Sequence, residues 1–109
     1  MDLDSLINKV EKIAAASTKF KIGETGRTLD GRFDTKYQEG FSQINQITWS
    51  TNKELIDVLE DELIKYFRRK YPRKCKNLKD GSAGEMTDIN GRYKIYVVST
   101  PKPIKPKKV

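Results

Sequence analysis

Two arginines follow a short predicted strand closely enough to act on a ligand at its end. Residues 19–23 read Lys-Phe-Lys-Ile-Gly, so apolar and lysine side chains alternate as they do in a half-buried strand. Gly23 ends this pattern, and further glycines at positions 26 and 31 break any regular continuation. The chain must therefore leave the strand through a turn, which delivers Arg27 and Arg32 close to the end of the strand.

The residue types that are missing restrict the chemistry further. The chain of 109 residues contains no histidine, and Cys75 is its only cysteine. This composition excludes histidine-dependent nucleophilic catalysis, zinc sites built from several thiolates and internal disulfides. It fits a reducing, intracellular compartment, and we expect the protein to be cytoplasmic. Any reaction must then use carboxylate, lysine, tyrosine or arginine side chains.

Positive charge is concentrated in one segment. Lysine and arginine total 22 against 15 acidic residues, and the net charge of +7 suits a polyanionic partner such as nucleic acid. The densest run lies within residues 68–80 and consists of Arg68, Arg69, Lys70, Arg73, Lys74, Lys76 and Lys79. This run either complements the dipole at the C-terminal end of a helix or contacts phosphates, and both interpretations stay open.

A long helix is predicted between Thr51 and Tyr71. Thr51 and Glu54 fit a capping box at its start, and Tyr71 precedes a proline, a position that disfavours helical backbone. Glu60 and Glu62 fall at opposite borders of the apolar arc of this helix. A carboxylate held at such a border needs a partner, and the periodicity does not choose between the two.

The remaining elements give one small α+β domain. Residues 4–16 place apolar side chains at steps of three and four, which is typical of an amphipathic helix. Residues 41–49 and 92–99 predict two further strands. Residues 101–109, rich in proline and lysine, predict a disordered basic tail, which leaves 1–100 as a single domain. No apolar run approaches the roughly 18 residues that cross a bilayer, and the N-terminus lacks a secretion signal.

Three segments, in order along the chain, resemble the motifs of the GIY-YIG nuclease superfamily. Residues 21–23 (Lys-Ile-Gly), the turn at 24–25 and Arg32, nine residues past the glycine, resemble the Tyr-Ile-Gly strand with its turn and arginine. Residues 60–65 (Glu-Asp-Glu-Leu-Ile-Lys) are similar to the family's Glu-x-x-Leu-Ile-Lys helix, and residues 75–77 (Cys-Lys-Asn) to the segment whose asparagine closes the site. The lysine in place of tyrosine looks most like the branch found in phage proteins and beside helicase domains.

The resemblance implies a DNA endonuclease whose three-stranded mixed or antiparallel sheet is flanked by helices. It implies that Glu60 holds a single Mg²⁺ or Mn²⁺ ion, that Arg32 contacts the scissile phosphate, and that Asn77 orients backbone or substrate nearby. Lys21, which replaces a family tyrosine, would act as a general base with a lowered pKa or would only bind phosphate. The other cations expected to bind substrate are Lys19, Arg27, Arg68, Arg69, Arg73, Lys74 and Lys76.

One family element, the Gly-Ile-Tyr strand, has no counterpart upstream of Lys19, where a helix is predicted instead. Residues 91–97 (Gly-Arg-Tyr-Lys-Ile-Tyr-Val) resemble it at the other end of the chain. We therefore hypothesise that the last strand pairs beside the first and brings Tyr93 or Tyr96 toward Lys21 as a further catalytic group. The alternative is that both tyrosines only pack in the core and at the edge of the sheet.

Three functions fit these features. The first is a metal-dependent endonuclease acting on DNA, with RNA as the other nucleic acid it would accept. The second is a nucleic-acid-binding module of the same fold that does not cleave. The third is a basic factor that binds a protein, such as a phage inhibitor of a host enzyme. We expect no membrane association and a monomer or weak homodimer, because so short a domain has little room for a separate recognition element.

Overall fold

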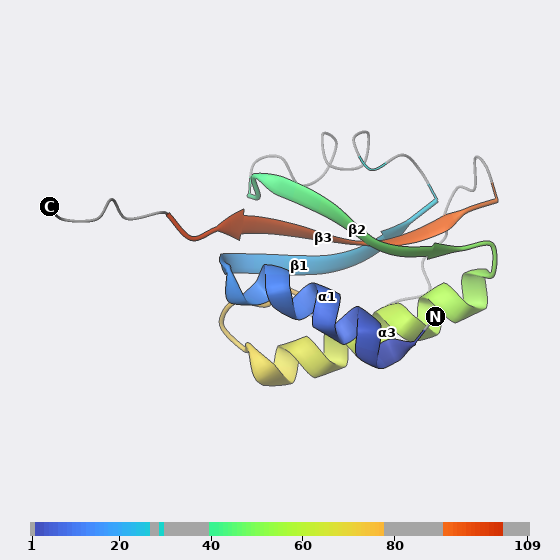
Figure 1. Cartoon of the computed structure of the whole chain (residues 1–109), viewed down its shortest axis with the longest axis horizontal. Coiled ribbons are helices and arrows are strands. Elements are labelled where there is room, and N and C mark those ends of the chain that lie inside the picture. The colour runs from blue at the N-terminus through green and yellow to red at the C-terminus, as the bar shows by residue number, and fades with distance from the viewer. Residues whose placement is uncertain (1, 27–28, 30–39, 78–90, 104–109) are drawn as a thin grey trace, which may run out of the picture.

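The computed structural model describes residues 2–26, 29, 40–77 and 91–103, and these form an α+β fold. The elements in order are α1 (Leu3–Ala15), β1 (Ser17–Thr25), β2 (Gln43–Ser50), α3 (Lys53–Lys70) and β3 (Tyr93–Pro101). The described strands make one antiparallel sheet in the order β1-β3-β2. Both helices lie on the same side of this sheet (Figure 1). The predicted fold class is therefore confirmed, with the antiparallel form of the sheet.

The last strand is the centre of the sheet and pairs with the first, as hypothesised. Ile22 lies opposite Val97 and Gly23 opposite Tyr96 in the β1–β3 pair. Residues 95–99 of β3 are all buried, so both faces of this strand are covered. A central strand needs apolar, β-branched side chains on both faces, which the Ile-Tyr-Val-Val run supplies.

The starts of the two helices differ slightly from the sequence prediction, which began the first helix at residue 4 and placed Thr51 at the cap of the second. The N-cap of α1 is Asp2, whose side chain accepts a hydrogen bond from the amide of Asp4. The N-cap of α3 is Asn52 rather than Thr51, because Asn52 Oδ1 accepts from the Leu55 amide at 3.2 Å. The predicted end of α3 is confirmed, since the helix stops at Lys70 with Tyr71 as its C-cap.

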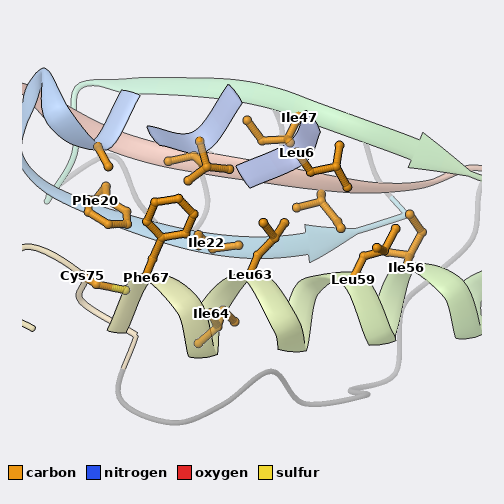
Figure 2. Packing of buried hydrophobic residues seen from close by; sticks show 14 residues of the cluster. Leu6, Phe20, Ile22, Ile47, Ile56, Leu59, Leu63, Ile64, Phe67 and Cys75 are labelled. Atoms are coloured by element: carbon orange, nitrogen blue, oxygen red, sulfur yellow. The ribbon is translucent and has the colours of Figure 1, made fainter. Parts of the chain in front are cut away.

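The core lies between the sheet and the two helices. In Figure 2, Phe67, Leu63, Leu59 and Ile56 project from one side of α3 toward β1. Phe67 packs edge to face against Phe20 of β1, with ring centroids 5.9 Å apart. From α1 the buried side chains are Leu6, Val10 and Ala14. This packing fixes the rotation of α3 and therefore decides which of its polar residues face the sheet.

Two further expectations concern the ends of the chain and the membrane. β3 continues to Pro101, and the Lys102 amide donates to the Ala16 carbonyl at 2.8 Å. Residues 104–109 of the predicted basic tail lie outside the described residues. In the described ranges, no helix combines the length and the apolar character needed to cross a bilayer.

Candidate functional site

β1 finishes and α3 begins at the same end of the sheet (Figure 1). These two elements carry a group of three carboxylates. Glu24 is close to the end of β1, and its alternation with the buried Ile22 turns its side chain toward the helices. Asp57 and Glu60 are three residues apart on α3 and therefore share one face of the helix. The charges of both residues act on Glu24, so two elements bring three acidic side chains together.

Glu60 is buried to an unusual degree for a carboxylate, with only 5% of the residue exposed. Burial, followed by the negative charges of Asp57 and Asp61, raises the pKa of Glu60 from 4.5 to about 8, against the opposing charge of Lys53. Without a bound cation, Glu60 therefore holds a proton at neutral pH in most molecules.

Glu24 lies in the same environment and also retains its proton at neutral pH. Burial, a hydrogen bond with Asp57 and the charge of Glu60 raise the pKa of Glu24 to about 9. Both Glu24 oxygens and Asp57 Oδ1 are buried acceptors that receive no other hydrogen bond from the described residues, whereas Asp57 Oδ2 accepts from Lys53 Nζ at 2.9 Å. Two carboxyl groups can form a hydrogen bond with each other only when one of them is protonated. The raised pKa of Glu24 and its hydrogen bond with Asp57 therefore both describe the protein with Glu24 protonated.

The donors in this acidic group suit a hard, hydrated cation. Among the described residues, no three His, Cys, Asp or Glu side chains converge closely enough to enclose a metal ion. Mg²⁺ does not require such a cage, because it keeps several waters and uses one or two carboxylates. Glu60 and Glu24 supply carboxylate oxygens, and neither Glu24 oxygen accepts a hydrogen bond from the part of the chain that the structure describes. These residues therefore fit a hydrated Mg²⁺ or Mn²⁺ ion.

The two predicted tyrosines lie on opposite faces of β3. Tyr96 pairs with Gly23, and this register makes it a diagonal neighbour of Lys21 on one face of the sheet. Tyr96 is 1% exposed. Tyr93, three residues earlier in the strand, projects from the other face and packs against the core under the helices. Of the two tyrosines, Tyr96 is therefore the one that the fold brings beside Lys21.

Lys21 and Glu60 do not lie on the same side of β1. Ile22, the residue after Lys21, belongs to the core under the helices, so Lys21 projects from the opposite face of the sheet. Glu60 approaches from α3, on the helix side, and the described charges that shift its pKa, those of Asp57, Asp61 and Lys53, also belong to α3. The alternation of β1 thus separates two side chains that the sequence motifs place in one site.

Asn77 closes the outer edge of β1. The Ile22 amide donates to Asn77 Oδ1 at 2.9 Å, and Asn77 Nδ2 donates to the Ile22 carbonyl at 2.8 Å. The segment before it pairs with Phe20, whose amide donates to the Lys74 carbonyl and whose carbonyl accepts from the Lys76 amide. A primary amide offers the same donor and acceptor as a peptide group, so Asn77 continues this ladder and holds the Lys-Ile-Gly backbone in place.

We expect Asn77→Ala to lower the free energy of unfolding by about 2 kcal/mol, because it leaves the buried Ile22 amide and carbonyl without partners. Chemical denaturation measures the loss, and hydrogen exchange at the Ile22 amide locates it. Asn77→Asp keeps the acceptor but not the donor, so its free energy of unfolding should lie between those of the wild type and Asn77→Ala. Lys76→Ala removes an exposed neighbour and serves as the control. Unchanged protection of the Ile22 amide in Asn77→Ala would contradict this assignment.

A basic pocket lies beside this edge, at the C-terminal end of α3. It has a volume of about 410 Å³ and is lined by Arg68, Pro72, Arg73, Cys75, Lys76 and Asn77. Lys76 Nζ donates to the Arg73 carbonyl at 2.8 Å, which ties two of the lining residues together. Burial raises the pKa of the Cys75 thiol, so this group stays neutral near pH 7. The pocket is therefore a cationic hollow of a size that accepts a phosphate group.

The other predicted substrate-binding cations are dispersed. Lys74 Nζ lies 5.2 Å from the centre of the Tyr71 ring and donates to the Ala14 carbonyl at 3.4 Å, so it serves packing at the sheet edge. Lys19 Nζ lies 4.9 Å from the centre of the Phe41 ring. Arg69 is exposed on α3 but does not line the basic pocket. Arg27 and Arg32 lie outside the described residues.

Glu24 and Asp57 were not among the residues predicted to form the site. A signal for Glu24 was present, because it follows Phe20 and Ile22 at intervals of two and must point to the same side. No comparable signal existed for Asp57, whose relation to Glu24 depends on how α3 packs on β1. Comparison with known proteins adds no further assignment: no family model, curated protein or solved structure matches the chain.

Proposed function

We propose that the protein is a metal-dependent endonuclease of GIY-YIG type that hydrolyses phosphodiester bonds in DNA. The observation that carries this proposal is the burial of Glu60 beside Glu24 and Asp57, with Lys53 opposing their charge. Buried carboxylates of one sign destabilise a fold unless a proton or a cation neutralises them. Glu60 lies at the position that the resemblance assigns to the metal ligand, and its burial is costly to the fold. Catalytic sites commonly contain such groups.

The residues divide into a cation-binding part and a phosphate-binding part. A bound Mg²⁺ or Mn²⁺ ion would supply a Lewis acid that offsets charge on the phosphate under attack. Glu60 would hold it, with Glu24 of β1 as a second carboxylate. Lys21 is assigned to phosphate binding rather than to proton removal, because its side chain leaves the sheet on the face away from Glu60.

The basic pocket supports a nucleic acid as the substrate. Arg68 follows Glu60 by eight residues on α3, which corresponds to about 12 Å along the helix axis and to the rise of three or four nucleotides in one strand. A strand could therefore place one phosphate in the pocket while another lies near the carboxylates. The same pocket would also serve a nucleic-acid-binding module that does not cleave, and it is the observation that favours this second function.

A plasmid nicking assay tests the proposal. We expect nicking with Mg²⁺ and none with a chelator, and we expect Glu60→Gln to reduce the rate at least about 100-fold. Glu62→Gln is the matched control, because it removes the same charge two residues away from an exposed position of the same helix. Equal activity of the two variants would reject the role of Glu60. Absence of nicking in the wild type, with DNA binding retained, would favour the binding module.

The binding part of the assay uses a second matched pair. Arg73→Ala should weaken DNA binding and lower the slope of log affinity against log salt by about 1, because Arg73 lines the pocket. Arg69→Ala removes the same charge from the last turn of α3 outside the pocket and should have a smaller effect. Equal losses in the two variants would mean that net charge, not the pocket, binds the nucleic acid.

A further inference from the structure

One exposed aromatic side chain is held by a cation at the end of the sheet. Trp49, near the end of β2, is 46% exposed, and the guanidinium carbon of Arg92 lies 4.9 Å from the centre of its ring. An indole has two faces, and a guanidinium stacked on one of them fixes the orientation of the ring. The register places Lys94 of β3 directly opposite Trp49, which adds a second positive charge to the same row.

The surroundings of Trp49 do not form an apolar docking surface. The other exposed large apolar side chains in the described ranges are Leu55, Val58 and Tyr66, and all three belong to α3. Trp49 instead pairs across the strands with Lys94, which pairs in turn with Thr25 of β1. This row lies on the sheet face opposite to the helices, because the residues next to it in β1 and β3, Glu24 and Ile95, point toward them. A planar ligand with an attached negative charge matches these neighbours better than an apolar protein surface does.

We propose that Trp49, oriented by Arg92, stacks on an unpaired base of the bound nucleic acid. Every base has a flat π face, and the phosphates on either side of it would meet Arg92 and Lys94. This inference rests on the proposed function only in requiring a nucleic acid as the partner. It specifies a substrate with exposed bases, that is, a single strand or a locally opened duplex.

The position of Trp49 relates this base site to the carboxylates. β1 and β2 both end, and β3 and α3 both begin, at the same end of the molecule (Figure 1). Thr25, the residue after Glu24, pairs with Lys94 of β3, which pairs in turn with Trp49 of β2. Two strand spacings therefore separate Thr25 from Trp49, a distance of about 10 Å. The carboxylates lie on the helix side of the sheet and Trp49 on the opposite side, so a strand that passes around this end of the sheet could place a phosphate near the carboxylates and a base on the indole.

The intrinsic fluorescence of the wild-type protein tests the inference directly, because Trp49 is the only tryptophan in the chain. The titrants are a thymidine oligonucleotide, a hairpin duplex of equal charge whose loop is a linker without bases, and an abasic strand that carries the same phosphates without bases. We expect the thymidine strand to quench the emission and to bind on the order of tenfold more tightly than the abasic strand. The hairpin and the abasic strand should leave the emission nearly unchanged.

Variants separate stacking from charge, with binding followed by the anisotropy of a labelled strand. Trp49→Leu should weaken binding of the thymidine strand about tenfold and leave binding of the abasic strand unchanged, whereas Trp49→Phe should retain part of the affinity. Tyr66→Leu, which removes an exposed aromatic ring from α3, is the control and should have no effect. Equal losses for both strands in Trp49→Leu, or no quenching by the thymidine strand, would overturn the proposal. Quenching without nicking would support the base site and reject the cleavage activity. Nicking without quenching would reject the base site and support the cleavage activity.

Discussion

Glu60→Gln is expected to raise the free energy of unfolding at pH 7 by about 3 kcal/mol, while it removes the proposed activity. The pKa of Glu60 is about 8 in the folded protein and near 4.5 when the chain is unfolded. Between these values the unfolded chain releases a proton that the folded protein retains, which favours unfolding by about 1.4 kcal/mol per pH unit. Glutamine has nearly the same shape and no proton to lose, so the variant avoids this cost.

The pH dependence gives the sign of the effect. The stability of the wild type should be unaffected by Glu60 below pH 4.5, should fall as the pH rises toward 8, and should level off above that value. Glu24 should lower the stability in the same way as the pH rises to about 9. This effect should be smaller in Glu60→Gln, because the charge of Glu60 is one of the causes that raise the pKa of Glu24. The variant curve should therefore be flatter throughout this range.

Urea unfolding between pH 5 and 9, in the presence of a chelator, measures this difference. Glu62→Gln is again the control, because its side chain is exposed and its removal should change the curve little. If Glu60→Gln and Glu62→Gln followed the wild-type curve in parallel, Glu60 would not be the group that titrates. A variant that is more stable but inactive would identify Glu60 as a residue kept for function at a cost to the fold.

Gly23→Ala should destabilise the protein by about 3 kcal/mol, at the upper end of what an added methyl group usually costs in a packed interior. A Cβ atom at Gly23 would collide with the Tyr96 ring, including its Cε2 atom at 2.9 Å. Tyr96 is almost fully buried in the central strand, so its ring cannot move aside without displacing its neighbours. Thermal or urea unfolding measures the loss.

Gly40→Ala provides the control for this prediction. The nearest atom to a Cβ at Gly40 is the flexible Lys19 Nζ at 3.7 Å, which is an ordinary contact, so we expect little change. Combining Gly23→Ala with Tyr96→Leu should cost less than the sum of the two single changes, because leucine leaves room for the new methyl group. Strict additivity in this double-mutant cycle would show that the Tyr96 ring is not what makes glycine necessary.

The type and order of the described elements were predictable, because they follow from local patterns. Alternation marked β1 and β3, and steps of three and four marked α1, since a side chain's face depends only on the backbone around it. The predicted end of the first strand at Gly23 was wrong, because Glu24 and Thr25 pair with Ile95 and Lys94 and extend β1 to Thr25. The proline at position 72 fixed the end of α3 in the same local way. The start of α3 was missed by one residue, because Thr51 and Asn52 are both good caps and tertiary packing selects between them.

The candidate site was only partly predictable. Periodicity left Glu60 and Glu62 as equal choices, and the resemblance to a family selected Glu60. The fold buries Glu60 and exposes Glu62, because Leu59 and Leu63 turn that side of α3 onto the sheet. The partners of Glu60 were not predictable from spacing, since Glu24 is 36 positions earlier in the chain.

Local patterns and composition are enough to predict which segments are helices and strands, that the protein is basic, and that carboxylate, lysine, tyrosine and arginine must do any chemistry. The packed fold was needed to show that Glu24 and Asp57 join Glu60, that Lys21 projects from the other face of β1, and that Trp49 is held by Arg92 at the same end of the sheet. The reason is that local backbone geometry sets the face on which a side chain emerges, whereas the packing of α3 and the pairing of β3 set what that face meets.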